Sequence, residues 1–104
     1  MVFTTLGSEE DAKVLVRKLV EERLVACGTV VPGTTSIYRW KEEITEETEV
    51  LVILKTVRAR WRDLEEAIAK HHPYDVPELI AVPITQGSPE YLAWLSDETT
   101  SNER

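Results

Sequence analysis

Residues that carry most enzyme and metal chemistry are scarce in this chain, which has one cysteine, two histidines and four glycines among 104 residues. A single cysteine, Cys27, excludes an intramolecular disulfide framework. It lies in an apolar run, so we expect a small buried core residue rather than a nucleophile. The glycines show neither GxGxxG nor GxxxxGK spacing, the patterns of phosphate-binding loops. With no nucleophile, base and orienting residue in evidence, we expect no enzymatic activity.

Positive charge is also scarce. Twelve Lys and Arg residues face nineteen Asp and Glu residues, for a formal net charge of −7. This balance argues against a nucleic-acid partner and against an anionic membrane surface, because both need basic patches. No apolar run approaches the ~20 residues that span a bilayer, and the first residues lack a signal-peptide pattern. Together with the lone cysteine, this predicts a cytoplasmic protein.

The order of hydrophobic patterns predicts one α+β domain over residues 1–104. A strand at 1–5 precedes a helix at 9–23, for which Ser8 is the expected N-cap. The glycine and proline at Pro32-Gly33 interrupt the next strand and suggest a bulge or an edge position. A charged connection, KEEITEE, leads to an almost continuously apolar strand at 49–56. These two strands should pair as a long antiparallel hairpin.

The C-terminal half adds a helix at 57–71, a strand at 78–85 and a short helix that opens at Ser88-Pro89. A polar tail is expected at 96–104. The resulting order, β-α-β-β-α-β with a terminal helix, is that of a ferredoxin-like sandwich, with two helices on one face of a four-stranded antiparallel sheet.

Both histidines, His71 and His72, end the second helix, directly before Pro73. Imidazole suits copper, zinc, iron and nickel, so this pair is the first candidate for metal chemistry. Because the residue before a proline leaves the helical conformation, the two rings should diverge. The alternative is structural: Pro73 ends the helix, and His72 is a packed ring with hydrogen-bonded nitrogens.

A second set of candidates could line a cleft or a contact between subunits. The aromatic side chains of Tyr38 and Trp40 share one face of the hairpin, which looks too long for one small domain to cover. Lys55 is the lone charge in the apolar run at 50–56, where it either extends to solvent or binds a ligand. Near the histidines, Tyr74 and Glu78 complete the set, Glu78 as a further oxygen ligand.

Four segments, in this order and spacing, resemble the CutA family of divalent-cation tolerance proteins. They are LVACGTVVPGTTSIYRW (24–40), LVILKT (51–56), HHPYDVPELIAVPI (71–84) and GSPEYLAWL (87–95). The resemblance covers nearly the whole chain. It implies a homotrimer in which the hairpins pair between subunits, cytoplasmic residence in a prokaryote, and binding of copper, with other divalent cations possible.

The family's copper ligands match this chain unevenly. Its histidine pair corresponds to His71 and His72, whereas a cysteine proposed as a further ligand is replaced by Thr4. A hydroxyl is a poor substitute for a soft thiolate, so imidazole-based Cu(II) binding is favoured over Cu(I) binding.

Two functions therefore stay open. In the first, a homotrimer binds copper through His71 and His72 and takes part in the response to heavy metals. In the second, a trimer similar to the P-II signalling proteins binds a small ligand or a protein partner at its subunit interfaces, and metal binding is incidental.

Side-chain amides are nearly absent: Gln86 and Asn102 are the only two, while 30% of the residues are charged. Few amides and many charges recur in thermophile proteins. We expect the purified protein to melt above about 65 °C in a calorimetric scan, beyond the range of most mesophile domains. A midpoint at about 45–65 °C would contradict a heat-tolerant source.

Overall fold

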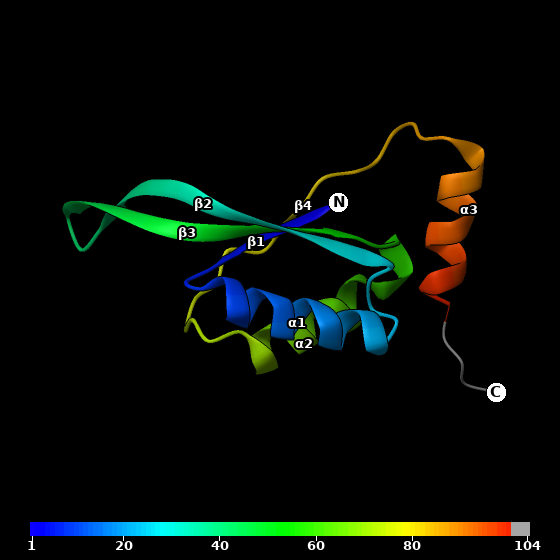
Figure 1. The fold of residues 1–104 in the computed structure, drawn as a ribbon, viewed down its shortest axis with the longest axis horizontal. Coiled ribbons are helices and arrows are strands. Elements are labelled where there is room, and N and C mark those ends of the chain that lie inside the picture. The colour runs from blue at the N-terminus through cyan, green and yellow to red at the C-terminus, as the bar shows by residue number, and fades with distance from the viewer. Residues whose placement is uncertain (101–104) are drawn as a thin grey trace.

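The computed structural model describes residues 1–100 and has a sheet of four antiparallel strands with two helices on one face (Figure 1). The strands lie in the order β2-β3-β1-β4. Their bounds are β1 Val2–Leu6, β2 Cys27–Trp40, β3 Glu43–Lys55 and β4 Ile80–Ala81. The helices are α1 Glu9–Glu21, α2 Trp61–His71 and α3 Pro89–Glu98, and a 3₁₀ turn at Arg58–Arg60 precedes α2. The expected ferredoxin-like order, with its additional helix, is confirmed.

Helix α1 begins where the sequence indicates. The hydroxyl of Ser8 accepts a hydrogen bond from the Asp11 amide at 3.1 Å, which satisfies one of the unpaired donors of the first turn. The helix ends before the expected residue because Arg23 adopts a left-handed backbone with φ of 59°. This conformation directs the Leu24 amide to the Leu19 carbonyl at 3.0 Å and closes the helix.

A hydrophobic core fills the space between the helices and the sheet. Strand β3 lies at its centre and buries alternate residues, Val50, Val52 and Leu54, as expected for side chains on one face of a strand. The core also contains buried side chains from β1, α1 and α2: Val2, Leu6, Ala12, Leu15, Leu19, Leu64 and Ile68. The described residues contain no helix that is both long and apolar enough to span a membrane.

The hairpin of β2 and β3 is longer than the sequence suggested. The expected charged connection at residues 41–47 is wrong, because β3 already begins at Glu43 and the turn consists of Lys41 and Glu42. Both turn residues have positive φ, 50° and 69°, the geometry that matches the twist of paired strands. Neither is glycine or asparagine, so the sequence carries no signal for this tight turn. In Figure 1 the hairpin extends well beyond the helices.

A bulge in β2 interrupts the hairpin between Val31 and Thr34, at the expected Pro32-Gly33. Gly33 has a φ of 77°, which a residue with a Cβ adopts only with strain.

The last strand is much shorter than the expected 78–85. Only Ile80 and Ala81 pair with β1. Two further hydrogen bonds join Val82 and Met1: the Val82 amide donates to the Met1 carbonyl at 2.7 Å, and the Met1 ammonium donates to the Val82 carbonyl at 2.6 Å. Strand β1 begins at Val2, which lies opposite Ala81, so it has no residue opposite the expected positions 83–85. The expected polar tail at 96–104 is also partly wrong: α3 continues to Glu98, and Thr99 is buried. Residues 101–104 lie outside the described part of the chain.

Close packing of α1 on the sheet depends on Gly28. A Cβ at this position would lie 2.7 Å from Val16 Cγ1 and 2.9 Å from Leu54 Cδ2. We expect Gly28→Ala to lower the free energy of unfolding by about 1–3 kcal/mol, as overpacking of a core does. Gly7→Ala is the matched control, because its Cβ would make an ordinary 3.5 Å contact with the Tyr74 hydroxyl. Chemical denaturation of both variants measures the difference; equal stabilities would contradict the packing argument.

Candidate metal and ligand site

The two adjacent histidines lie in different environments at the end of α2. His71 is the last helical residue and is half-buried, whereas His72 has an extended backbone, with φ −75° and ψ 136°, and is 7% exposed. Pro73 explains the change, because it disfavours a helical conformation at His72. The amide of His72 still closes the helix by donating to the Ile68 carbonyl at 2.9 Å.

Both ring nitrogens of His72 are held by the backbone. Nδ1 accepts a hydrogen bond from the Tyr74 amide at 3.1 Å. Nε2 lies 2.9 Å from the Thr5 carbonyl and donates to it, since a carbonyl can only accept. Burial lowers the pKa of His72, while the Thr5 hydrogen bond and the charge of Glu49 oppose this shift. The ring is therefore a neutral structural link between α2 and β1, as in the structural alternative, and a metal could bind it only by displacing one of these bonds.

Tyr74 joins this turn to the hairpin. Its ring lies 4.9 Å from the His72 ring between centroids, and its hydroxyl donates to Glu49 Oε2 at 2.8 Å. Glu49 is only 7% exposed, and its carbonyl accepts a hydrogen bond from the Thr34 hydroxyl at 2.6 Å. Burial raises the pKa of Tyr74, and the bond to Glu49 adds to the shift, so the phenol stays protonated as a donor.

Farther along the hairpin, Tyr38 makes a second bond of the same kind, from its hydroxyl to the Glu47 carboxylate. Glu47 and Glu49 are two residues apart on β3, so their side chains point to the same face of the strand. Sequence reasoning missed this pair of carboxylates. The available signal was a charge at Glu49 directly before the apolar run of β3.

Three of the predicted cleft residues lie outside the cluster that His72, Tyr74, Glu49, Tyr38 and Glu47 form. Lys55 ends β3, where it pairs with Cys27; it is eight residues from Glu47, about 26 Å along a strand. Trp40 is 57% exposed at the tip of the hairpin. Glu78 is exposed between the histidine turn and β4.

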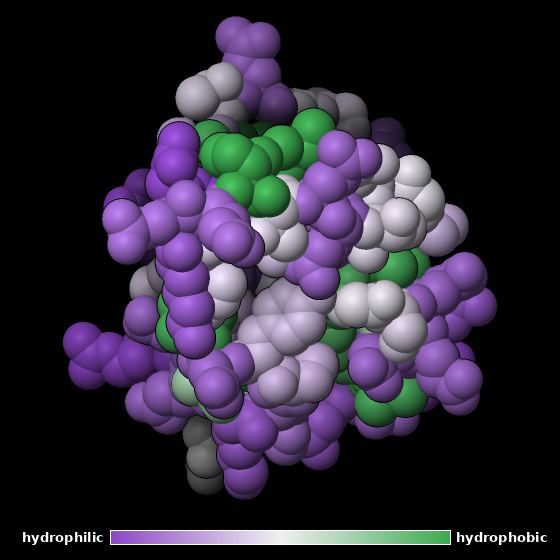
Figure 2. Space-filling view, turned by 90° about the vertical axis from the view of Figure 1, so that its left-hand side faces the viewer, coloured by the Kyte–Doolittle hydropathy of each residue, from purple (hydrophilic) through white to green (hydrophobic). Residues whose placement is uncertain are grey.

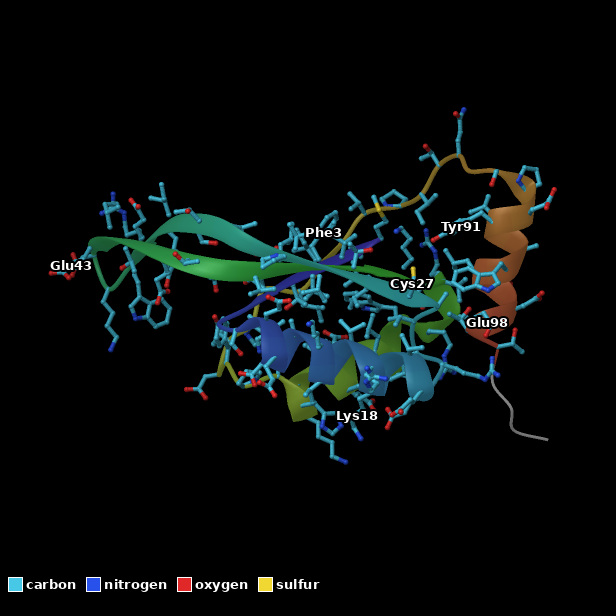
Figure 3. The ribbon with its side chains drawn as sticks, viewed as in Figure 1. Phe3, Lys18, Cys27, Glu43, Tyr91 and Glu98 are labelled. Atoms are coloured by element: carbon cyan, nitrogen blue, oxygen red, sulfur yellow. The ribbon has the colours of Figure 1, made fainter. Side chains whose placement is uncertain are left out.

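Cys27 differs from the small buried residue that the sequence suggested. It is half-buried, and its Sγ lies 3.6 Å from the Tyr91 hydroxyl of α3. Figure 3 places both residues at the opposite end of the sheet from Glu43 at the hairpin tip. Cys27 pairs with Lys55, four residues along β3 from the partner of Thr5, so it lies about 13 Å along the strand from the residue that His72 contacts.

Within the described part of the chain, the ligands that the resemblance implied are not assembled into a metal site. Thr4 is fully buried, and its hydroxyl has no hydrogen-bond partner among residues 1–100. Within residues 1–100, no three His, Cys, Asp or Glu side chains are arranged to hold a metal ion. His71 remains the one imidazole that is half-exposed, and the side-chain hydrogen bonds of the described residues do not include its ring.

The lowered pKa of His72 predicts a pH-dependent stability. The unfolded chain takes up a proton at this residue near its ordinary pKa of 6.5, before the folded chain does. Stability is therefore fully present above pH 6.5 and is lost as the pH falls towards the lower folded-state pKa. We expect denaturation curves to show a loss between pH 6.5 and 5 that is smaller in His72→Gln. His71→Gln is the control and should keep the wild-type slope; the same slope in all three proteins would contradict this assignment.

Comparisons with a family model and with individual known proteins agree on one family for this chain. Residues 1–98 match the family described as CutA1 divalent ion tolerance protein. A relative from Thermus thermophilus, named divalent-cation tolerance protein CutA, is 48% identical over 99 residues, which cover 95% of this chain and 96% of the relative. The relative of that name from Escherichia coli is 42% identical over 96 residues, covering 92% and 86%.

Solved structures agree with the sequence comparison. The Thermus thermophilus divalent cation tolerance protein has a TM-score of 0.92 at 47% identity, covering 95% of this chain and 96% of that one. CutA1 from Pyrococcus horikoshii has a TM-score of 0.91 at 38% identity, covering 96% and 97%. The match over nearly all the described residues, in sequence and in fold, shows that this chain belongs to the CutA1 divalent ion tolerance protein family.

Proposed function

We propose that this protein acts in divalent-cation tolerance by binding copper as a cytoplasmic homotrimer. The observation that carries the proposal is the half-exposed ring of His71 at the end of α2, in a chain whose family is named for divalent-cation tolerance. Imidazole is a good ligand for Cu(II), and other divalent cations such as zinc accept it as well.

His71 is the primary ligand in this proposal, and His72 orients the turn. The two backbone hydrogen bonds of His72 fix where the chain leaves α2, which sets the position of the neighbouring His71. A metal that used both rings would have to break the bond to Thr5 or the bond from Tyr74. Thr4 offers a hydroxyl where a soft thiolate would favour Cu(I), so the expected oxidation state is Cu(II).

The surface of the hairpin supports an oligomer. Strand β2 is a sheet edge of fourteen residues, and an open edge of this length is a template for pairing with another chain. Three large side chains near the tip, Ile37, Trp40 and Ile44, are 66%, 57% and 64% exposed. Figure 2 looks at the hairpin end and shows hydrophobic side chains grouped in its upper part among hydrophilic ones. In a trimer, each subunit could hold its own ion, or three His71 rings could share one.

A second candidate function is a P-II-like signalling or scaffold module. It is favoured by the two hydrogen bonds that the His72 ring makes to the backbone. Because of these bonds, the described residues of a single chain offer too few free side chains to hold a metal ion. In this reading Tyr38, Tyr74 and Glu49 belong to a contact between subunits or to a ligand cleft, and metal binding is incidental.

Calorimetric titration of Cu(II) and Zn(II) into metal-free protein separates the two functions. We expect His71→Ala to weaken Cu(II) binding at pH 7.5 by tenfold or more. His72→Gln should weaken it less, because its ring is not the primary ligand. Wild-type affinity should fall between pH 7.5 and pH 5, since a protonated imidazole cannot ligate.

Light scattering of each variant provides the control, because a change in binding counts only if the oligomer stays intact. It also tests the trimer, which a monomeric wild-type protein would contradict. Cu(II) binding that is weak in the wild type, or that survives both substitutions, would overturn the copper proposal and leave the signalling or scaffold module.

A further inference from the structure

The turn of residues 71–74 is tied to β3 by a single side chain. Tyr74 follows the two histidines and Pro73, and its hydroxyl donates to the Glu49 carboxylate at 2.8 Å. Among the described residues, the other hydrogen bonds of the turn reach only α2, β1 and the turn itself. The phenol passes the end of β1, where a Cβ at Gly7 would lie 3.5 Å from the hydroxyl. Tyr74 is therefore the link between the histidine turn and the central strand of the sheet.

Glu49 has a fixed position in this sheet. It lies opposite Thr34 in the register of β2 and β3, and its carbonyl accepts a hydrogen bond from the Thr34 hydroxyl at 2.6 Å. The next residue, Val50, pairs with Leu6 of β1, and both belong to the core. A shift of Glu49 would disturb both ladders of β3, because one residue of slippage moves every side chain to the other face.

The carboxylate of Glu49 in turn depends on Tyr74. Glu49 is 7% exposed, and no salt bridge among residues 1–100 includes it. Within the same residues, the Tyr74 hydroxyl is the one side-chain donor to this carboxylate. Removing the partner of a buried charged acceptor leaves the acceptor desolvated and unpaired, which costs more than the bond itself contributes. The two side chains are therefore held in one arrangement.

We propose that Tyr74 is a positioning residue for His71, and that it holds this ring in a fixed direction for metal binding by transferring the position of β3 to the turn. Only His72 and Pro73 separate the two residues. The fixed φ of Pro73 and the hydrogen bond from the Tyr74 amide to the His72 ring leave this segment little freedom. The bond of the His72 ring to Thr5 holds the same segment on β1.

This inference deepens the copper proposal and rests on it for its functional consequence. Within residues 1–100, no three His, Cys, Asp or Glu side chains are arranged to hold an ion, so His71 has to meet ligands from solvent or from another chain. A ring in this situation needs a reproducible direction, because productive metal geometry tolerates displacements of only about 0.5 Å. Loss of a residue that orients a metal ligand typically costs about 10–100-fold in metal affinity.

The first test uses the metal-free, full-length protein with isotope-labelled histidine. Its two histidines give two sets of ring signals in NMR spectra, which His71→Gln assigns. Tyr74→Phe keeps the aromatic ring and removes the bond to Glu49. We expect the His71 ring signals of this variant to shift or broaden, because the ring samples more directions. Tyr91→Phe is the control for a lost phenol hydroxyl, because that hydroxyl contacts β2 and not the turn; its His71 signals should match those of the wild type.

Calorimetric titration of Cu(II) at pH 7.5 provides the second test. Tyr74→Phe should weaken binding about tenfold, the lower end of the range for residues that orient a metal ligand. The residual affinity of His71→Ala should not fall further when Tyr74→Phe is added, because Tyr74 acts through His71. Glu49→Ala should weaken binding as Tyr74→Phe does. Glu49→Gln should restore it, because the amide oxygen still accepts the hydrogen bond, and this rescue separates the bond from the charge.

His71 ring signals that stay unchanged in both Tyr74→Phe and Glu49→Ala would refute the inference. So would equal losses of Cu(II) affinity with and without His71, which would mark a general loss of structure. Light scattering and denaturation check the assembly and folding of each variant; if Tyr74→Phe unfolds, the comparison of Glu49→Ala with Glu49→Gln decides. A wild type that does not bind Cu(II) would contradict the proposed function alone, because the metal-free signals still show whether Tyr74 positions the ring.

Discussion

Strand β3 is the element on which the rest of the structure depends. It pairs with β1 on one side and with β2 on the other, and it carries the buried face formed by Val50, Val52 and Leu54. Buried side chains of α1 and α2 belong to the same core cluster as these three residues. The other half of β3, from Glu43 to Glu49, continues beyond the covered sheet and holds the hairpin in register with β2. One half of this strand therefore contributes side chains to the core, and the other half forms part of the projecting hairpin. Because side chains alternate between the two faces of a strand, the register of one half fixes which face each residue occupies in the other.

The boundary between these halves is polar and well connected. Glu49 lies there, buried, with its carboxylate bonded to Tyr74 and its carbonyl bonded to Thr34. A buried carboxylate without such donors would be costly, so the tyrosine is needed to keep it at this position. Through the adjacent ring of His72 the same cluster reaches the end of α2. The turn that carries His71 is therefore fixed to both β1 and the hairpin.

Much of the fold could be predicted because its signals are local. The Ser8 cap, the apolar spacing of α1 and α2, the bulge at Pro32-Gly33 and the Ser88-Pro89 helix start all act within a few residues. The errors arose where distant contacts decide. Lys41 and Glu42 form the hairpin turn against their own preferences because long flanking strands pair. Strand β4 stops after Ala81 because its register with β1 places Ala81 opposite Val2, the first residue of β1.

The candidate site shows the same division. By itself, the sequence determined that two histidines end a helix before a proline, and that they must therefore diverge, because the proline restricts the backbone of the preceding residue. Only the tertiary structure decided that both ring nitrogens of His72 bond to the backbone of Thr5 and Tyr74. It also decided which of the nineteen carboxylates, Glu49, is buried beside this turn, and that Lys55 lies far from the tyrosines. Local sequence sets which conformations a residue can adopt. Which polar atoms become buried, and with which partners, depends on how strands distant in the sequence come together around one core.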